Sequence, residues 1–457
     1  MSKTYRSWNP NQQWLLPPCP QDWLPEGDLV YFLLETVNAL DISAILQKYE
    51  QQTRGYPPYH PRMMVALLFY AYCRGLFSSR KIMQACEERL TFRVIVGDDI
   101  PDFRTTSDFR KLHLQELSDL FLQVLRLCQE AGLVKLGHIA LDGTKIKANA
   151  SRHKAMSYGR MKEEEERLQG EIRDLLAQAE AADGQEDREL GADRRGDELP
   201  QELARRESRL KRIQEAKKAL EAQAKAAAEQ AEQKREQGSE EADNVPGKRG
   251  GRRKKDPAVP AEKKQYNFTD PESKIMKTSN KGWDQCGNAQ AAVDGHQQII
   301  VACDVTDQAN DKQQLAPMLT QAQENVGPEH KIQGASADSG YYSEANVHYA
   351  ESAGIDAYIA TERLKHTDRV AKCPRGRMAK DLTVKEKMAR KLRTKKGRQR
   401  YSRRKCIVEP VFGQIKGGRG FIQFSLRGLT KMRGEWSLVC LTHNLLKLFV
   451  ARCAMAA

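Results

Sequence analysis

The amino-acid sequence predicts a mixed α/β fold preceded by an all-helical N-terminal part. Three observations support this fold class. Apolar residues recur at helical spacing up to about residue 135, short apolar runs bounded by turn residues appear from residue 138 onwards, and a long stretch rich in Glu, Ala, Lys and Arg separates the first of those runs from the rest. A chain of 457 residues, 40% of them hydrophobic, can bury a sizeable core.

The composition predicts a soluble protein that binds a polyanion. The formal net charge is +14, which favours nucleic acid over a membrane as the partner. The N-terminus lacks the apolar core of a signal peptide, and no apolar run approaches the roughly 20 residues of a membrane span. The ten cysteines never occur at CxxC spacing, which disfavours a zinc cluster and is typical of reduced thiols. We therefore expect a cytoplasmic, nucleoid-associated protein.

The first 135 residues are interpreted as a helical domain that binds DNA. A buried helix is expected over residues 61–73, with Pro61 in its first turn, where proline is favoured. A second helix is expected to begin near Ser79, capped by Ser78 or Ser79. A third, with a broad apolar face, is expected over residues 108–131. Residues 1–135 are thus predicted to be the N-terminal domain.

A strand and a long insertion follow. Residues 138–147 form a short apolar run that suits a buried strand. Residues 160–237 predict two helices, broken around 184–200, whose apolar seams favour an antiparallel hairpin. The glycine-rich, cationic segment 246–257 is expected to be flexible and to follow a phosphate backbone. We interpret residues 160–265 as an insertion consisting of a helical hairpin and a basic linker.

The remaining elements predict a ribonuclease-H-like core. The expected order is strands at 273–278, 288–293 and 299–305, a helix at 313–324, a strand at 334–339, a helix after 343 and a strand at 357–360. The core would consist of residues 136–159 and 266–457, with the insertion placed after its first strand. The apolar segment 436–451 predicts a further core helix.

Three acidic residues lie where this fold could use them for chemistry. Asp142 interrupts an apolar strand and is followed by Gly143, and Asp338 ends another apolar run. An acid at the carboxyl end of a sheet strand is well placed to bind a ligand, although it can also simply cap a turn. Glu409 follows a segment, 363–405, with nineteen Lys/Arg against three Asp/Glu, which favours contact with nucleic acid.

The surroundings of Glu409 and the competing acids complete the set of expectations. Pro410 is expected to start a helix that Gly417 and Gly418 end, with Lys416 two turns from Glu409. Asp304 also follows an apolar strand and is the reserve choice for the second acid. The remaining acids of that segment, Asp307 and Asp311, are expected to begin the next helix, where acids favour the positive end of the helix dipole.

Three blocks of sequence resemble the acid blocks of bacterial insertion-sequence DDE transposases. They are LDGTKIKANAS at 141–151, ADSGYYSE at 337–344 and VEPVFGQIK at 408–416; the segments DVTDQANDK at 304–312 and DFRKLH at 108–113 are similar to linking segments of that family. The resemblance implies a ribonuclease-H-like core in which Asp142, Asp338 and Glu409 are catalytic and bind two Mg²⁺ or Mn²⁺ ions. It also implies cleavage of double-stranded DNA at terminal inverted repeats, followed by strand transfer of the 3′-hydroxyl end into target DNA.

The same resemblance implies that Tyr401, Arg404 and Lys416 contact the DNA backbone. The broader class has three residues between arginine and glutamate, whereas four separate Arg404 from Glu409 here, so Lys405 is an alternative to Arg404. A synaptic complex that joins two DNA ends implies a homo-oligomer, expected to be a dimer. Two other functions remain open from the sequence: a ribonuclease-H-like metal nuclease or resolvase without strand transfer, and a non-catalytic DNA-binding protein.

Overall fold

The computed structural model describes residues 19–50, 57–97, 99–190, 201–237, 258–278, 282–362, 373–374, 376 and 381–456. The chain divides into two compact units: residues 1–146 with 288–457, here called the core unit, and residues 147–287, here called the inserted unit. These units divide the chain at residues other than the predicted boundaries at 135, 159 and 265. The predicted linker 246–257 and residues 363–372, 375 and 377–380 of the predicted basic segment lie outside the described residues.

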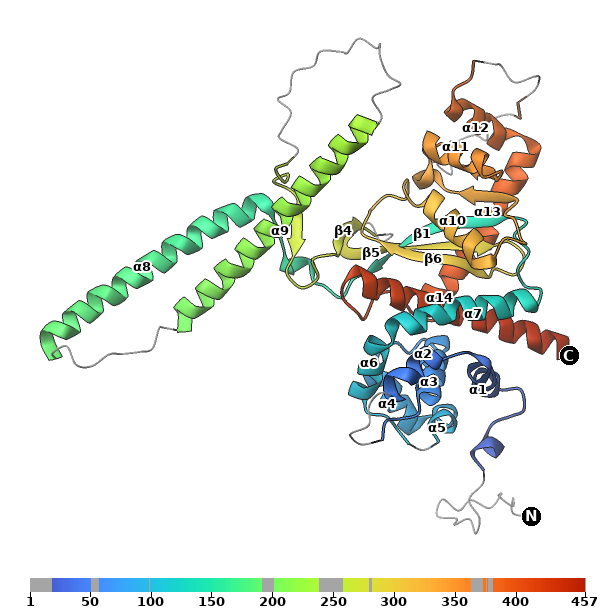
Figure 1. Cartoon of the computed structure of the whole chain (residues 1–457), viewed down its shortest axis with the longest axis horizontal. Coiled ribbons are helices and arrows are strands. Elements are labelled where there is room, and N and C mark those ends of the chain that lie inside the picture. Colours follow the sequence, from blue (N-terminus) through green and yellow to red (C-terminus); the bar gives the residue numbers. More distant parts are fainter. Residues whose placement is uncertain are drawn as a thin grey trace, which may run out of the picture. The chain divides into compact units, whose positions relative to one another are not determined.

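The core unit is built around one mixed sheet. Its strands are β1 (Ile139–Lys147), β5 (Trp283–Asp294, entering from the inserted unit), β6 (Ile300–Thr306), β7 (Gly334–Ala337) and β8 (Asp356–Ile359), in the order β6-β5-β1-β7-β8 (Figure 1). β5 and β6 are antiparallel, whereas β1, β7 and β8 are parallel, with Ile139 opposite Ala335 and Ala335 opposite Ala357. The prediction of a mixed α/β fold is therefore confirmed.

Helices that follow the strands in the sequence pack against the edge and the ends of the sheet. They are α10 (Leu315–Val326), α11 (Glu344–Ser352), α12 (Val384–Arg393), α13 (Lys395–Gly413) and α14 (Leu429–Ala456), with 3-10 turn η3 (Ser339–Tyr341) and π turn η4 (Gln414–Gly418). The outer edge of β6 is covered by side chains: Asn444 of α14 bonds the N–H and C=O of Ile300, and Asn325 of α10 donates to Val301 O. The unpaired backbone groups of an edge strand can pair with another chain and cause aggregation, and these amides occupy such groups on β6.

The N-terminal helices belong to the same compact unit as the sheet. They are α1 (Leu29–Ala39), α2 (Ser43–Glu50), α3 (Pro61–Cys73), α4 (Ser79–Glu88), α5 (Leu90–Val96), α6 (Phe103–Leu112) and α7 (Leu114–Glu130), after 3-10 turn η1 (Pro20–Trp23). The expected helices at 61–73 and from Ser79 are present. The helix expected over 108–131 is two helices, because the chain breaks at His113, which caps neither helix with its side chain but pairs with Tyr49.

Long helix α14 joins the N-terminal helices to the sheet. It packs against α7, α3 and β6, and its residues Leu438, Val439, Cys440, Leu441 and Leu445 are fully buried. Although α14 is long and apolar enough to cross a membrane, its Thr442, His443 and Asn444 are buried and hydrogen-bonded inside the unit. These contacts identify it as the core helix that the sequence predicts.

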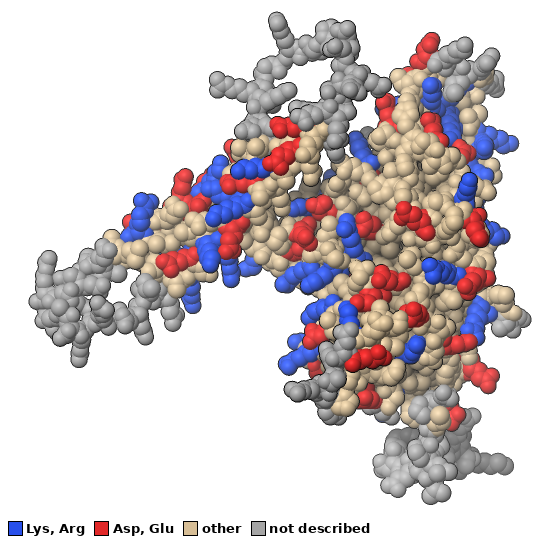
Figure 2. All heavy atoms as spheres, in the orientation of Figure 1, with Lys and Arg blue, Asp and Glu red and all other residues tan. Residues whose placement is uncertain are grey.

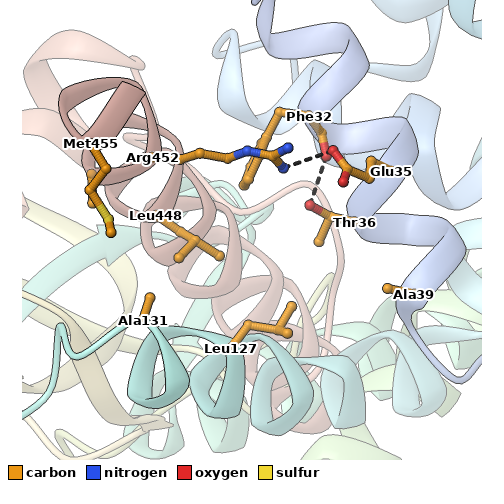
Figure 3. A pocket seen from close by; sticks show the side chains of 10 residues that line it. Phe32, Glu35, Thr36, Ala39, Leu127, Ala131, Leu448, Arg452 and Met455 are labelled. Carbon is orange, nitrogen blue, oxygen red and sulfur yellow. Dashed lines mark hydrogen bonds and ion pairs between the residues drawn. The ribbon is translucent and has the colours of Figure 1, made fainter. Parts of the chain in front are cut away.

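An apolar pocket of about 550 Å³ lies where α1, α7 and α14 meet (Figure 3). Phe32, Leu127 and Leu448 line its apolar walls, and the ion pair between Arg452 and Glu35, at 2.7 Å, lies at its side. None of the predicted site residues lines this pocket. It is therefore separate from the predicted site.

The inserted unit contains an antiparallel helical hairpin. Helices α8 (Tyr158–Leu190) and α9 (Gln201–Gln237) pack through a small apolar cluster of Tyr158, Met161, Leu168, Ile213, Ala216 and Leu220. Ion pairs between Glu165 and Lys217 (2.7 Å) and between Glu171 and Arg206 (2.9 Å) flank that cluster. Cations and acids alternate over the hairpin surface (Figure 2), so it shows mixed rather than purely basic character. Strand pair β2 (Ala155–Ser157) and β3 (Gln265–Asn267) closes its base, and β4 (Lys274–Lys277) pairs with the first residues of β5.

Candidate active site

Asp142 and Asp338 come together because β1 and β7 are parallel neighbours. Ile139 lies opposite Ala335, and each aspartate is three residues further along its own strand. The register of the ladder thus places Asp142 level with Asp338, which directly follows β7 as the N-cap of η3. Two carboxylates distant in sequence therefore converge at the carboxyl end of β7, and the carboxyl ends of strands are where α/β folds bind ligands.

The raised pKa of Asp142 partly reflects the proximity of Asp338. Burial raises the pKa of the carboxyl to about 6, the nearby guanidinium of Arg404 opposes that rise, and the charge of Asp338 adds to it. Burial also raises the pKa of the Tyr341 hydroxyl, and the charges of Asp311, Asp142 and Asp338 raise it further. Three carboxylates therefore act on one buried hydroxyl, which marks a concentrated negative charge.

Arg404 partly neutralises that charge. Its Nη1 lies 2.9 Å from Asp142 Oδ2, and the side chains of Arg404 and Asp142 are 12% and 22% exposed. Burial raises the pKa of the nearby Tyr401 hydroxyl, and the positive charge of Arg404 opposes that rise, while Arg404 Nε is buried without a partner. In this structure Arg404 is thus paired with Asp142.

Glu409 lies on the same helix as Arg404 but does not join the aspartates. It is an exposed residue of α13, five positions beyond Arg404 and four beyond the exposed Lys405, so it shares a side of the helix with Lys405 rather than Arg404. Within the described ranges no group of three or more His, Cys, Asp or Glu is arranged to hold a metal ion. The structure thus brings together two of the three predicted acids.

The expectation that Pro410 starts a helix is wrong. Pro410 lies inside α13, which runs from Lys395 to Gly413. Proline has no N–H for the carbonyl four residues earlier, here that of Cys406. Gln298 supplies the missing donor, because its Nε2 lies 2.8 Å from Cys406 O. A side chain from the β5–β6 turn therefore lets the helix continue through the proline and carry Glu409.

The end of this helix places Lys416 beside β1. After α13 the chain makes a π turn, Gln414–Gly418, which ends at the two glycines as expected. Lys416 Nζ lies 3.1 Å from the carbonyl oxygen of Lys145, three residues beyond Asp142. α13 and its π turn therefore follow β1, with Arg404 near Asp142 and Lys416 further along the strand.

The reserve choice Asp304 and the predicted helix-start acid Asp311 both have specific partners in the structure. Asp304 forms an ion pair with Arg433 at 2.8 Å. Asp311 does not begin a helix, since α10 starts at Leu315; its Oδ1 instead accepts hydrogen bonds from Asn288 Nδ2 (2.6 Å) and Gln290 Nε2 (2.7 Å). Sequence reasoning missed this position. The available signal was the alternation of Asn288 and Gln290 among the otherwise small and apolar residues 286–293 of β5, which puts two amides on one face.

The donor chemistry of this region fits a hard divalent cation. Mg²⁺ and Mn²⁺ take oxygen ligands, and Asp142 and Asp338 supply two carboxylates that repel one another without a counter-ion. Buried Asn288 Oδ1 has no hydrogen-bond partner and lies 3.1 Å from the position that a Cβ on Gly143 would occupy. Gly143 and Asp142 therefore adjoin a free oxygen donor as well as the second aspartate.

Comparison with known proteins gives matches to two family models. Residues 18–112, which contain α1 to α6, match the "Transposase domain (DUF772)", and residues 249–445, which include Asp338 and Glu409, match the "Transposase DDE domain". Searches of curated proteins and of solved structures gave no match. Both matched families are described as transposase domains, and they occur in one chain. The chain therefore belongs to the insertion-sequence DDE transposases.

Proposed function

We propose that this DNA transposase cleaves DNA at the terminal inverted repeats of its element and transfers the resulting 3′-hydroxyl end into target DNA. The observation that carries the proposal is the pair Asp142 and Asp338, level on adjacent parallel strands and close enough for Asp338 to raise the pKa of Asp142. The family matches supply the nucleic-acid context for that pair.

The sheet topology supports a ribonuclease-H-like core. The strands run β6-β5-β1-β7-β8, the first two antiparallel and the last three parallel. Backbone bonds from Gly295 N to His138 O and from Ala148 N to Gln285 O show that β5 runs opposite to β1. The sequence predicts three strands followed by helix, strand, helix and strand for this fold, with an insertion after its first strand, and the observed element order supports that interpretation.

The proposed chemistry assigns a role to each acid. Asp142, Asp338 and Glu409 would hold two divalent ions, Mg²⁺ or Mn²⁺, which when bound activate the attacking oxygen and stabilise the leaving oxygen. Arg404 holds Asp142 in position and offsets its charge. Glu409 reaches the aspartates only if its exposed carboxylate turns towards them. The distance that it must cover is limited, because α13 is held to β1 by Arg404 and is followed by Lys416, which also contacts β1.

The proposed DNA contacts follow the same helix. Lys405 is exposed and is free to meet a phosphate, whereas Arg404 would have to leave Asp142 to do so. This favours Lys405 over Arg404 as the backbone contact, with Tyr401 and Lys416 beside it. We propose further that α1–α6 recognise the terminal repeat, that a dimer forms the synaptic complex and that the protein associates with the nucleoid.

A strand-transfer assay tests the proposal. Full-length protein is incubated with Mg²⁺, a labelled DNA end taken from the boundary of its element and an unlabelled target plasmid. We expect both a cleaved end and a slower-migrating joined product on a denaturing gel. Cleavage without joining would instead show a nuclease or resolvase, and binding without either product would show a non-catalytic DNA-binding protein.

The raised pKa of Asp142 predicts how metal affinity depends on pH. A carboxyl must be ionised to bind a metal ion, and the pKa of Asp142 is about 6 rather than 3.8. Mn²⁺ affinity is therefore expected to be nearly constant above pH 7 and to fall about tenfold per unit below pH 6. Calorimetric titration of Mn²⁺ at pH 5, 6, 7 and 8 measures this. Constant affinity down to pH 5 would contradict the assignment of Asp142 as a ligand.

A further inference from the structure

Asp311 lies between the two segments that carry the aspartates. A Cβ on Gly143, next to Asp142, would lie 2.8 Å from Asp311 Oδ1. A Cβ on Gly340, two residues after Asp338, would lie 3.1 Å from Asp311 Oδ2. Each carboxylate oxygen of Asp311 thus sits against one glycine, in space that any other residue would fill.

We propose that Asp311 is a positioning residue that sets the separation of Asp142 and Asp338. Its carboxylate acts as a wedge between β1 and η3, and the absence of side chains at Gly143 and Gly340 is what admits it. This inference rests on the proposed function, because it assumes that Asp142 and Asp338 bind the metal ions.

The hydrogen bonds of Asp311 favour positioning over direct metal binding. Oδ1 accepts from both Asn288 Nδ2 and Gln290 Nε2, and Lys145 Nζ lies 3.7 Å from the same oxygen. Two amide donors occupy the lone pairs of that oxygen, so it is already committed. An atom with these partners is suited to holding neighbours in place.

A second set of bonds ties the Asp311 loop to the turn after Asp338. The Tyr341 hydroxyl donates to Gln290 Oε1, whose amide nitrogen donates to Asp311. Asn346 Nδ2 bridges the carbonyl oxygens of Lys312 and Tyr341, at 2.7 Å from each. The loop before α10, the strand β5 and the turn η3 therefore form one bonded network, in which a shift of Asp311 moves Asp338.

The experiment compares Mn²⁺ binding by calorimetry in full-length wild type and five variants: Asp311→Ala, Asp311→Asn, Gly340→Ala, the double variant Asp311→Ala/Gly340→Ala, and the control Asp307→Ala. Thermal unfolding without metal is measured for each. Asp307 is an acid of the same loop that makes none of the contacts above. We expect Asp311→Ala to weaken Mn²⁺ binding about 10- to 100-fold, the range typical for residues that support a metal ligand.

The conservative variant separates positioning from ligation. The amide oxygen of Asp311→Asn can accept both hydrogen bonds, so we expect Mn²⁺ affinity within about threefold of wild type. If Asp311→Asn loses as much affinity as Asp311→Ala, then Asp311 is itself a ligand and the proposal is overturned. Equal binding by Asp311→Ala and wild type would also overturn it.

Gly340→Ala gives an independent test if Asp311→Ala does not fold. It adds one methyl against Asp311 Oδ2 and Asp338 Oδ1, at 3.1 and 3.0 Å, and removes no hydrogen bond. We expect a loss of affinity of about tenfold that is not additive with Asp311→Ala, because both changes act at one contact. Additive losses, or no loss in Gly340→Ala, contradict the wedge. A failure of the proposed function gives a different result, because the wild-type protein itself would then bind no Mn²⁺.

Discussion

Asp338→Asn is expected to lower the rate of DNA cleavage about 1,000-fold, equivalent to roughly 4 kcal/mol of transition-state stabilisation from metal-ion binding. The amide oxygen can still accept the hydrogen bond from Gly340 N, at 2.8 Å in the native protein, so the turn after β7 keeps its shape. The substitution removes mainly the negative charge. Single-turnover cleavage of a labelled element end in Mg²⁺ measures the loss, and a mobility-shift assay checks that DNA binding remains within about twofold.

Asp304→Asn is the matched control for this prediction. Asp304 lies within strand β6 of the same sheet, but its carboxylate pairs with Arg433. We expect the control to retain cleavage within a fewfold of wild type. Full activity in Asp338→Asn, together with a large loss in Asp304→Asn, would show that the second acid has been assigned to the wrong strand.

Glu409→Gln is expected to reduce cleavage about 100-fold or more while leaving the fold intact. The side chain is exposed on α13, so replacing its charge with an amide costs little stability. Glu409 is proposed to contribute to cleavage only by sharing metal ions with the two aspartates. The loss of activity should therefore appear in the rate of the chemical step. Single-turnover kinetics at saturating DNA, with thermal unfolding alongside, separate these effects.

Glu351→Gln provides the control for the glutamate. Glu351 lies on α11, is also highly exposed and contacts His348 of the same helix. Its replacement should leave cleavage unchanged. If Glu409→Gln is as active as this control, the third acid lies elsewhere, and Asp311 becomes the first alternative because it is already beside the aspartate pair.

The N-terminal helices and the sheet form one compact unit in which α14 contacts both. The DUF772 match covers α1 to α6, and the DDE match covers the strands from β3 onwards and most of α14. α14 packs against α3 and α7 as well as β6, so it links the two matched regions. Buried Glu435 of α14 lies near Arg110, which donates to Tyr72 and to Phe77 O. A DNA end held by α1–α6 would thus be bound by the same compact unit that carries the acids.

The sequence by itself determined the elements of the core and the positions of its acids. Strands β1, β7 and β8 were predictable because short apolar runs between turn residues reflect only local burial. Asp142 and Asp338 stood out for the same reason, since an acid in an apolar run needs an explanation. The alternating pattern and the order of elements then sufficed for a mixed α/β class, without knowledge of any contact.

Only the tertiary structure decided which polar groups meet. Arg404 pairs with Asp142, which is 262 positions away in the sequence. Gln298 donates a hydrogen bond to the Cys406 carbonyl, so that α13 continues through Pro410. The sequence predicted that Asp311 begins a helix, whereas hydrogen bonds from Asn288 and Gln290 hold it in the candidate site. Periodicity reports whether a residue is buried. It does not report the partner, because a hydrogen bond or ion pair between distant segments depends on strand register and helix placement, which local sequence does not encode.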